Sequence, residues 1–314
     1  MTSSRAQRDP HRPESNQSKE SGSYYGRPVL KRPVWESTDI AGYLFLGGLA
    51  GASSLLGAAA QTSRRPGVAR ASKVGAVTAG VGSLAALIHD LGRPTRFLHM
   101  LRVFKITSPM SVGAWLLAGY VPMAGLAAAS ATTGRAPRIG AAASAGAAAL
   151  GPAVASYTAV LISDTAVPAW HEAYREMPFV FVGSAATAAG GLGMIAAPTD
   201  QAGPARAMAV MGATTELSAF EAMRRRLGPL GEPYDSGRAG RYLTASKVLS
   251  VVGACGALLG RRSRMASALS GAALLAASAA TRWGIFHAGI ESANDPHQTV
   301  EPQRRRLRSV PARH

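Results

Sequence analysis

The chain contains 314 residues, of which 47% are hydrophobic and only 16% are charged, with 35 glycines and one cysteine. This share of charged residues is low for a soluble domain of such length. Because Cys255 is the only cysteine, the composition excludes a disulfide within the chain, a zinc knuckle and a set of iron–sulfur ligands. An iron–sulfur cluster would therefore belong to a partner, and no metal site is expected in this chain.

The formal net charge of +17, from 34 basic and 17 acidic residues, could suggest nucleic acid binding. The basic residues, however, lie mainly in the connections between apolar runs, where the positive-inside rule places them in membrane proteins. We therefore expect no nucleic acid partner and attribute the charge to membrane topology and contact with membrane lipid.

Residues 1–34 are polar and basic, and no apolar segment follows early enough to form a cleavable signal peptide. We expect them to form a disordered tail. The chain then contains apolar runs of roughly 18 to 22 residues, the length that crosses a hydrocarbon core about 30 Å thick. Eight such runs lie at about 40–60, 73–89, 110–130, 139–162, 177–197, 204–222, 241–260 and 265–286.

These runs predict an all-α integral membrane protein, a bundle of eight transmembrane helices over residues 35–290, followed by a disordered basic tail at 291–314. The sixth run is the least regular because Glu216 and Glu221 interrupt it. No other stretch is long and mixed enough to bury a core of its own, so we expect no soluble domain.

An even number of spans places both termini on one side of the membrane. That side would contain the basic residues of 1–34, of the connection at 91–105, of the connection that includes Arg224–Arg226, and of the C-terminal tail. The opposite side contains fewer, although it still includes Arg64, Arg65 and Arg261. The imbalance predicts a multi-pass protein of the cell membrane with both termini in the cytoplasm.

The ionisable residues within or beside the runs fall at the ends on the side of the termini. They are Glu36, Asp39, His89, Asp90, Asp164, Glu216, Glu221, Arg282 and His287. Polar side chains at membrane depth cost a few kcal/mol each on insertion scales, so a one-sided group of them usually lines a cavity, a proton route or a partner surface. Some of them could instead mark span ends at the headgroups.

Two kinds of site fit this group of residues. A haem between spans is disfavoured because axial histidines normally face each other inside the spans, whereas His89, His99, His171 and His287 lie at ends or in connections. A lipophilic carbonyl compound that exchanges protons fits better, because it needs an apolar slot, hydrogen-bond donors and acid–base groups. Trp35, Tyr43, Trp115 and Trp170 could line the slot, although Trp35 and Trp170 could equally belong to an interfacial aromatic belt.

Several segments resemble the NrfD/PsrC-like polysulfide reductase membrane subunits. The clearest is Asp90-Leu91-Gly92-Arg93-Pro94 followed by Arg96-Phe97-Leu98 and the segment 108–115, SPMSVGAW. Three further pieces agree with it: the opening segment 42–51 (GYLFLGGLAG), the segment 167–171 (VPAWH), and Arg282 with Ala288-Gly289 and Ser292-Ala293 before Asp295-Pro296. The resemblance covers about residues 35–296, and the Ala- and Arg-rich composition looks like that of a high-GC bacterial member.

The resemblance implies a membrane anchor of a respiratory molybdoenzyme complex that exchanges electrons with menaquinone. Its partners would be a four-cluster ferredoxin-like iron–sulfur subunit and a molybdopterin catalytic subunit, and the anchor itself would bind no haem or iron–sulfur cluster. On this interpretation the proton-handling residues are Asp90, Asp164, Glu216 and Arg282. The residues expected at the quinone are Trp35, Tyr43, His89, Arg93, Arg96, Trp115, Trp170 and His171.

Particular roles follow for the residues of these segments. Gly92 and Pro94 are expected to end the second helix, and Arg93 and Arg96 to offer donors to a docking subunit, a quinone carbonyl or a lipid phosphate. His171 or His89 is the expected ligand of a quinone carbonyl, because histidine exchanges protons near neutral pH. An ordinary buried ion pair between Arg282 and an acid is the alternative for the acidic group.

Helix packing gives a further expectation. Gly47 and Gly51 are four residues apart in the first run, a spacing that lets two backbones approach closely in a membrane. The competing function is a small transporter or channel, which more often shows inverted repeats and charges at the membrane midplane.

Overall fold

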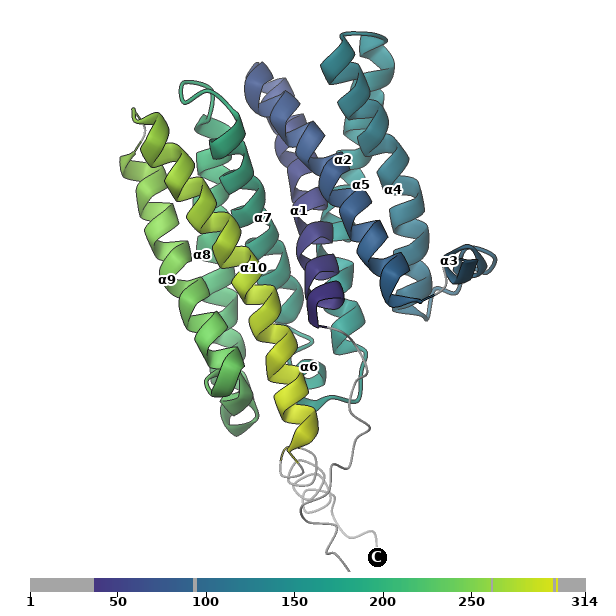
Figure 1. Ribbon diagram of the computed structural model, residues 1–314, viewed down its shortest axis with the longest axis vertical. Helices are drawn as coiled ribbons and strands as arrows, with labels where there is room; N and C mark the ends of the chain where they lie inside the picture. Colours follow the sequence, from purple (N-terminus) through teal and green to yellow (C-terminus); the bar gives the residue numbers. More distant parts are fainter. Residues whose placement is uncertain (1–36, 93–94, 261, 296–297, 299–314) are drawn as a thin grey trace, which may run out of the picture.

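The computed structural model describes residues 37–92, 95–260, 262–295 and 298, which form an all-helical bundle (Figure 1). Within these residues, eight helices have 20 residues or more and no strand occurs. The long helices are α1 (Ser37–Thr62), α2 (Pro66–Asp90), α4 (Pro109–Thr133), α5 (Pro137–Ser163), α7 (Met177–Ala196), α8 (Gly203–Leu227), α9 (Gly237–Leu259) and α10 (Arg264–Asn294).

Three short elements lie in the connections: α3 (Thr95–Met100), α6 (Pro168–Glu172) and the 3-10 helix η1 (Gly228–Tyr234). All three connect long helices at the end of the bundle where α1 begins and α10 ends (Figure 1). We call this the terminus end. The connections at the opposite end are short, at 63–65, 134–136, 197–202 and 260–263.

Six helices are long and apolar enough to cross a membrane: α1, α2, α4, α5, α7 and α9. The remaining two long helices, α8 and α10, match the sixth and eighth predicted runs but carry more polar side chains. In α8 these include Glu216 and Arg224–Arg226, and in α10 they include Arg282. The all-helical membrane fold is confirmed, and the count of eight spans stays a prediction for these two helices.

Proline sets where several helices begin. Pro66, Pro109 and Pro137 are the first residues of α2, α4 and α5, where the missing amide hydrogen costs no intrahelical bond. For this reason α2 starts earlier than its apolar run and includes Arg70 and Lys73 in its first turns. At its other end, Gly92 adopts a φ of 68°, which a residue with a side chain rarely adopts, and the helix ends there as expected.

The first helix packs in the centre of the bundle, against α2, α5 and α7. A β-carbon on Gly51 would lie 2.3 Å from the carbonyl oxygen of Gly151 in α5, and one on Gly47 would lie 3.2 Å from the Ser83 hydroxyl in α2. The expected close packing around these two glycines is therefore confirmed. It fixes the position of α5, whose other face forms the pocket described below.

The chain segments outside the described residues include several predicted features. The N-terminal tail, Trp35 and Glu36, Arg93 with Pro94, and most of the predicted C-terminal tail lie there. At the C-terminal side, α10 continues to Asn294, past the boundary expected at residue 290.

Candidate functional site

A pocket with a volume of about 600 Å³ opens at the terminus end between α4 and α5, beside α6. Its walls are mainly apolar and include Ile106, Val112, Leu116, Ala153 and Val160. Its polar lining groups are Thr107, Ser156, Tyr157, Ser163, Asp164, His171 and Tyr174. We call it the α4–α5 pocket. Its size and its mixture of apolar walls with a few polar groups are typical of sites for small lipophilic molecules.

Two predicted residues meet in this pocket. Asp164 follows the last residue of α5 and is exposed, and His171 lies on α6 after a proline that starts this short helix. The Nδ1 atom of His171 lies 3.2 Å from the carbonyl oxygen of Ser163. A carbonyl can only accept, so Nδ1 carries the hydrogen, and the neutral ring presents Nε2 as a hydrogen-bond acceptor.

Two further polar side chains complete the lining. The hydroxyl of Ser163 is buried and makes no hydrogen bond within the described part of the chain. The hydroxyl of Tyr157 is hydrogen-bonded to that of Tyr43 in α1, and the two rings meet edge to face with their centroids 6.4 Å apart. Tyr43 does not line the pocket itself, but it fixes the position of the Tyr157 side chain that does. A ligand could receive a hydrogen bond from Ser163 without displacing an existing one.

Glu216 and Arg282 form a separate buried group between α1, α7, α8 and α10. The Thr281 hydroxyl donates a hydrogen bond to the Glu216 carboxylate. It is also hydrogen-bonded to the Ser246 hydroxyl, over 2.6 Å. The guanidinium of Arg282 donates to the carbonyl oxygens of Phe181, at 2.8 Å, and Leu44, at 3.4 Å, and lies 3.9 Å from the centre of the Phe181 ring.

The position of this group differs from the expectation that it would lie at the terminus end with Asp164. Glu216 and Arg282 sit in the middle part of their helices, because α8 and α10 continue beyond the apolar runs to Leu227 and Asn294. Among the described side chains, those of Glu216 and Arg282 form no direct ion pair within 4.0 Å. One Glu216 oxygen and one Arg282 nitrogen also lack hydrogen-bond partners among the described residues.

The second helix ends in a third polar group. His89 Nδ1 lies 2.7 Å from a carboxylate oxygen of Asp39 at the start of α1, with the His89 side chain 75% exposed. Asp90 follows it and is partly exposed. Neither residue lines the α4–α5 pocket, so the structure does not bring Asp90 or His89 together with Asp164 and His171.

The remaining predicted residues lie elsewhere. Trp170 is fully buried and donates a hydrogen bond from its indole nitrogen to the carbonyl oxygen of Ile285, over 2.7 Å, so it anchors α6 on α10. Trp115 is 42% exposed and meets Phe104 edge to face, and Arg96 donates to the carbonyl oxygen of Leu91. Trp35 and Arg93 lie outside the described residues.

Tyr157 and Ser163 were missed by the sequence reasoning. Both lie in or beside the fourth apolar run, where a single hydroxyl looks like an ordinary membrane-helix residue. A separation of six residues puts Tyr157 and Ser163 about 120° apart around a helix, so their spacing gave no signal. Only the position of α6 shows which face of α5 matters.

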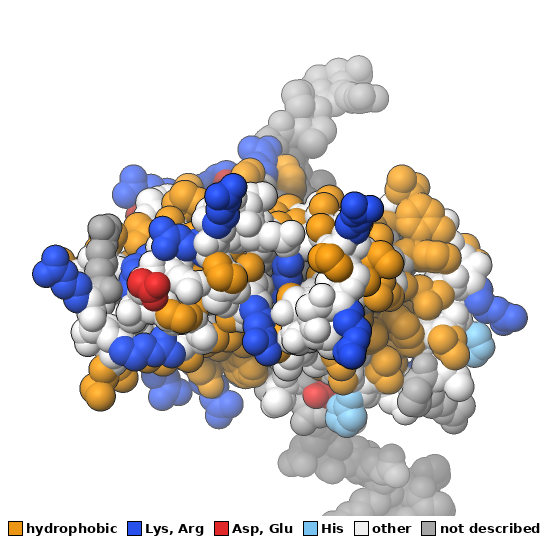
Figure 2. Space-filling view, turned by 90° about the horizontal axis from the view of Figure 1, so that it is seen from above, with side chains coloured by type: hydrophobic (Ala, Val, Ile, Leu, Met, Phe, Trp, Pro, Cys, Tyr) orange, Lys and Arg blue, Asp and Glu red, His pale blue; other side chains and the backbone are white. Residues whose placement is uncertain are grey.

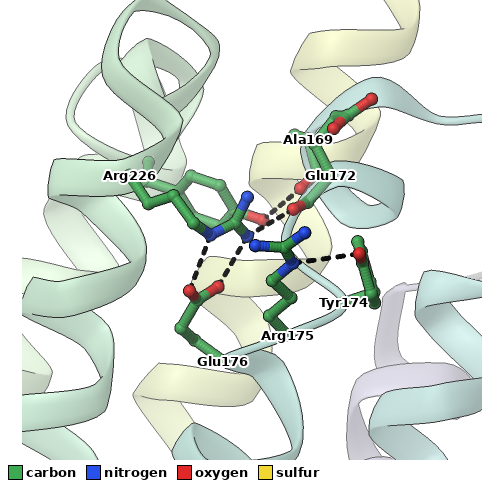
Figure 3. A network of polar contacts seen from close by, with 7 residues as sticks. Ala169, Glu172, Tyr174, Arg175, Glu176 and Arg226 are labelled. Carbon is green, nitrogen blue, oxygen red and sulfur yellow. Dashed lines mark hydrogen bonds and ion pairs between the residues drawn. The ribbon is translucent and has the colours of Figure 1, made fainter.

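Figure 3 shows the polar network that holds the connection between α6 and α7. Arg226 at the end of α8 donates to both carboxylate oxygens of Glu176, over 2.6 Å each, and to the carbonyl oxygen of Glu172. The Arg226 guanidinium lowers the pKa of the Glu176 carboxyl by hydrogen bonding to its charged form. Tyr234 donates to the carbonyl oxygen of Ala169, and burial raises the pKa of its hydroxyl. These contacts hold α6, and with it His171, in place.

Across the described residues, no group of three or more His, Cys, Asp or Glu side chains lies close enough to hold a metal ion. Independently of this, the lining of the α4–α5 pocket contains groups that can exchange protons, Asp164 and His171, and hydroxyl groups that can form hydrogen bonds with a ligand.

The comparisons with known proteins agree with this architecture. The family model described as Polysulphide reductase, NrfD matches residues 29–201, more than half of the chain. The matched region includes α1 to α7 and all the residues that line the α4–α5 pocket. A search of curated proteins finds no match. With six apolar helices of membrane-spanning length and this family match, the chain is a multi-pass membrane protein that belongs to the NrfD polysulphide reductase family.

Proposed function

We propose that this chain, which its family identifies as a membrane subunit of an oxidoreductase complex, is the quinone-reactive subunit of that complex. It would pass electrons between menaquinone and an iron–sulfur partner subunit attached to a molybdopterin catalytic subunit. The observation that carries the proposal is the α4–α5 pocket, where apolar walls meet His171, Asp164, Ser163 and Tyr157. A quinone needs this combination, because its ring and tail are apolar while its carbonyls change protonation as electrons pass.

The chemistry of the pocket follows from its hydrogen bonds. Oxidation of a quinol releases two electrons and two protons, so one group has to accept a hydroxyl proton and another has to lead it to water. The Nε2 atom of His171 is the free acceptor, because Nδ1 donates to the Ser163 carbonyl. Asp164 is exposed at the mouth and can pass the proton on. In the reverse reaction, the reduction of a quinone, the Ser163 hydroxyl can donate a hydrogen bond to a quinone carbonyl oxygen.

The test is quinone turnover by the complete complex after substitution in the pocket. We expect His171→Gln and Asp164→Asn each to slow menaquinone turnover about 100-fold, the usual size of a general acid–base effect. Reduction of an artificial dye by the catalytic partner should stay unchanged, which shows that the complex still assembles.

His99→Gln is the matched control, since His99 is exposed on α3 and lies outside the pocket lining. Native turnover rates in both pocket variants, with normal assembly, would overturn the quinone site.

A transporter is the second candidate, and the buried Glu216–Arg282 group supports it. A carboxylate and a guanidinium in the middle of two helices are the kind of charged residues that line ion or proton routes. Purification of the chain from its native membrane separates the two functions. An iron–sulfur protein that co-purifies in stoichiometric amount supports the quinone-reactive subunit, whereas a chain that purifies alone supports the transporter.

A further inference from the structure

A second pocket, at the end of the bundle opposite the termini, has a volume of about 480 Å³ and lies between the α1–α2 and α4–α5 connections. Four basic side chains line it, Arg64, Arg65, Arg70 and Lys73, and its lining contains no acidic residue. We call it the cationic pocket. Figure 2 looks down on this end, where Lys and Arg side chains outnumber acidic ones.

The deepest cation is Lys73, which is only 8% exposed. Its ammonium group donates a hydrogen bond to the side-chain oxygen of Gln61, a neutral group that leaves the charge uncompensated. An ammonium has three hydrogens to donate, and a buried charge is normally paired with an opposite one. The burial of Lys73 beside a neutral amide therefore points to an anionic ligand that supplies the missing charge.

The cations at the mouth are available to the same ligand. The guanidinium groups of Arg64 and Arg70 make no hydrogen bond within the described part of the chain, whereas Arg65 donates to the carbonyl oxygen of Asp200. Arg64 also adopts a φ of 56°, a conformation that costs an ordinary residue about 1 kcal/mol or more and that tends to persist at functional sites. Two free guanidinium groups next to a buried ammonium suit a phosphate, which offers several oxygens at once.

The surroundings of the pocket favour a lipid as the source of the phosphate. The pocket lies where the spanning helices α2, α4 and α5 begin or end, which is the depth of lipid headgroups. Val74 and Ile139, neighbours in the chain of the lining residues Lys73 and Gly140, are 38% and 60% exposed. The helices α2 and α5 therefore carry exposed apolar side chains at the depth of the pocket, which acyl chains can cover.

We propose that the cationic pocket binds the phosphate of an anionic phospholipid headgroup in the leaflet opposite the termini. The four basic side chains favour a net negative headgroup, and the exposed apolar side chains of α2 and α5 at the same depth favour an amphiphile. A soluble phosphate would match only the first of these features.

The test measures thermal stability of the purified full-length protein in a neutral detergent during titration with short-chain phosphatidylglycerol. Phosphatidylcholine and inorganic phosphate are titrated in parallel. We expect phosphatidylglycerol to raise the unfolding temperature at concentrations where the other two have no effect. In the double variant with Arg64→Gln and Arg70→Gln, the apparent Kd for phosphatidylglycerol should rise about tenfold or more, because two charged donors are lost.

The matched control is the double variant with Arg138→Gln and Arg262→Gln. Arg138 and Arg262 are exposed at the same end but do not line the pocket, so the control removes the same charge and should keep the native affinity. Equal weakening in both double variants would mean attraction by the whole face and would overturn the site. Stabilisation by inorganic phosphate at the same concentrations, or no stabilisation by phosphatidylglycerol, would overturn the lipid.

If the Arg64 and Arg70 double variant does not fold, mass spectrometry of the native protein replaces it. Lipid retained on the native protein should then be enriched in phosphatidylglycerol over phosphatidylcholine, and equal retention of the two would contradict the proposal.

Discussion

Single side chains in this protein have roles that depend on which neighbours they reach rather than on their type. His171 and Trp170 are consecutive, yet His171 lines the α4–α5 pocket while Trp170 is buried against α10. Arg282 likewise joins three helices through carbonyl oxygens and an aromatic ring, contacts that the sequence-based expectation of a proton-handling residue or an ion pair did not include. The chemistry of each residue could be predicted from the sequence, but its location could not.

At this scale we predict that Arg282→Gln lowers the stability of the protein by about 2 to 4 kcal/mol. The change removes charged hydrogen bonds to Phe181 and Leu44 and leaves the nearby Glu216 carboxylate without a positive charge. Thermal unfolding in detergent measures the loss. Arg175→Gln is the control, because Arg175 is exposed and should change stability by less than about 0.5 kcal/mol. Equal stability of the two variants would show that Arg282 has no structural role.

At the scale of helices, the apolar runs located all eight long helices, but several helices extend into charged sequence beyond the ends of their runs. The second run was expected to begin at residue 73, but α2 begins at Pro66 because proline favours the first helical position even where arginine follows. The pocket was not predictable in the same way. Its lining comes from α4, α5, α6 and the connection before α4, and no spacing within one run shows that these segments meet.

The contact between α1 and α5 gives a prediction for a single methyl group. Gly51→Ala would place a β-carbon 2.3 Å from the Gly151 carbonyl oxygen, so the two helices have to separate and the protein should lose about 1 to 3 kcal/mol. Gly42→Ala, in the same helix, places its β-carbon 3.9 Å from Trp283 and should be nearly neutral. Thermal unfolding of both variants in detergent measures the two changes in stability. A neutral Gly51→Ala would mean that the backbones do not approach this closely.

The stability that the connection between α6 and α7 contributes depends on pH through Glu176. Its folded pKa is lowered by Arg226, so the stabilisation is complete above the unfolded pKa of about 4.3 and is lost as the pH falls through the lower folded value. We expect unfolding temperatures of the native protein and of Glu176→Gln to differ at pH 7 and to approach each other as the pH falls below the unfolded pKa of about 4.3. A difference that persists at low pH would exclude this ion pair as its cause.

At the scale of the whole molecule, both described ends of the chain lie at the same end of the bundle, as an even number of spans requires (Figure 1). We predict that this end is cytoplasmic. Green fluorescent protein fused to the C-terminus should fluoresce, and alkaline phosphatase fused there should be inactive. Phosphatase inserted in the connection at 134–136 should be active. The reverse pattern would mean that the opposite end, with its cationic pocket, faces the cytoplasm.

The consecutive positions of Trp170 and His171 have a mechanical consequence. The indole of Trp170 fills its site so completely that a β-carbon on Gly289 would lie 1.8 Å from the ring. Tyr234 and Arg226 donate hydrogen bonds to carbonyl oxygens of the same short segment. A densely packed element of this kind cannot yield without moving α10. His171 is therefore held in place before any ligand arrives. The pocket should therefore be a preorganised binding site. The rate of ligand exchange should be limited by entry of the ligand from the lipid rather than by rearrangement of the protein.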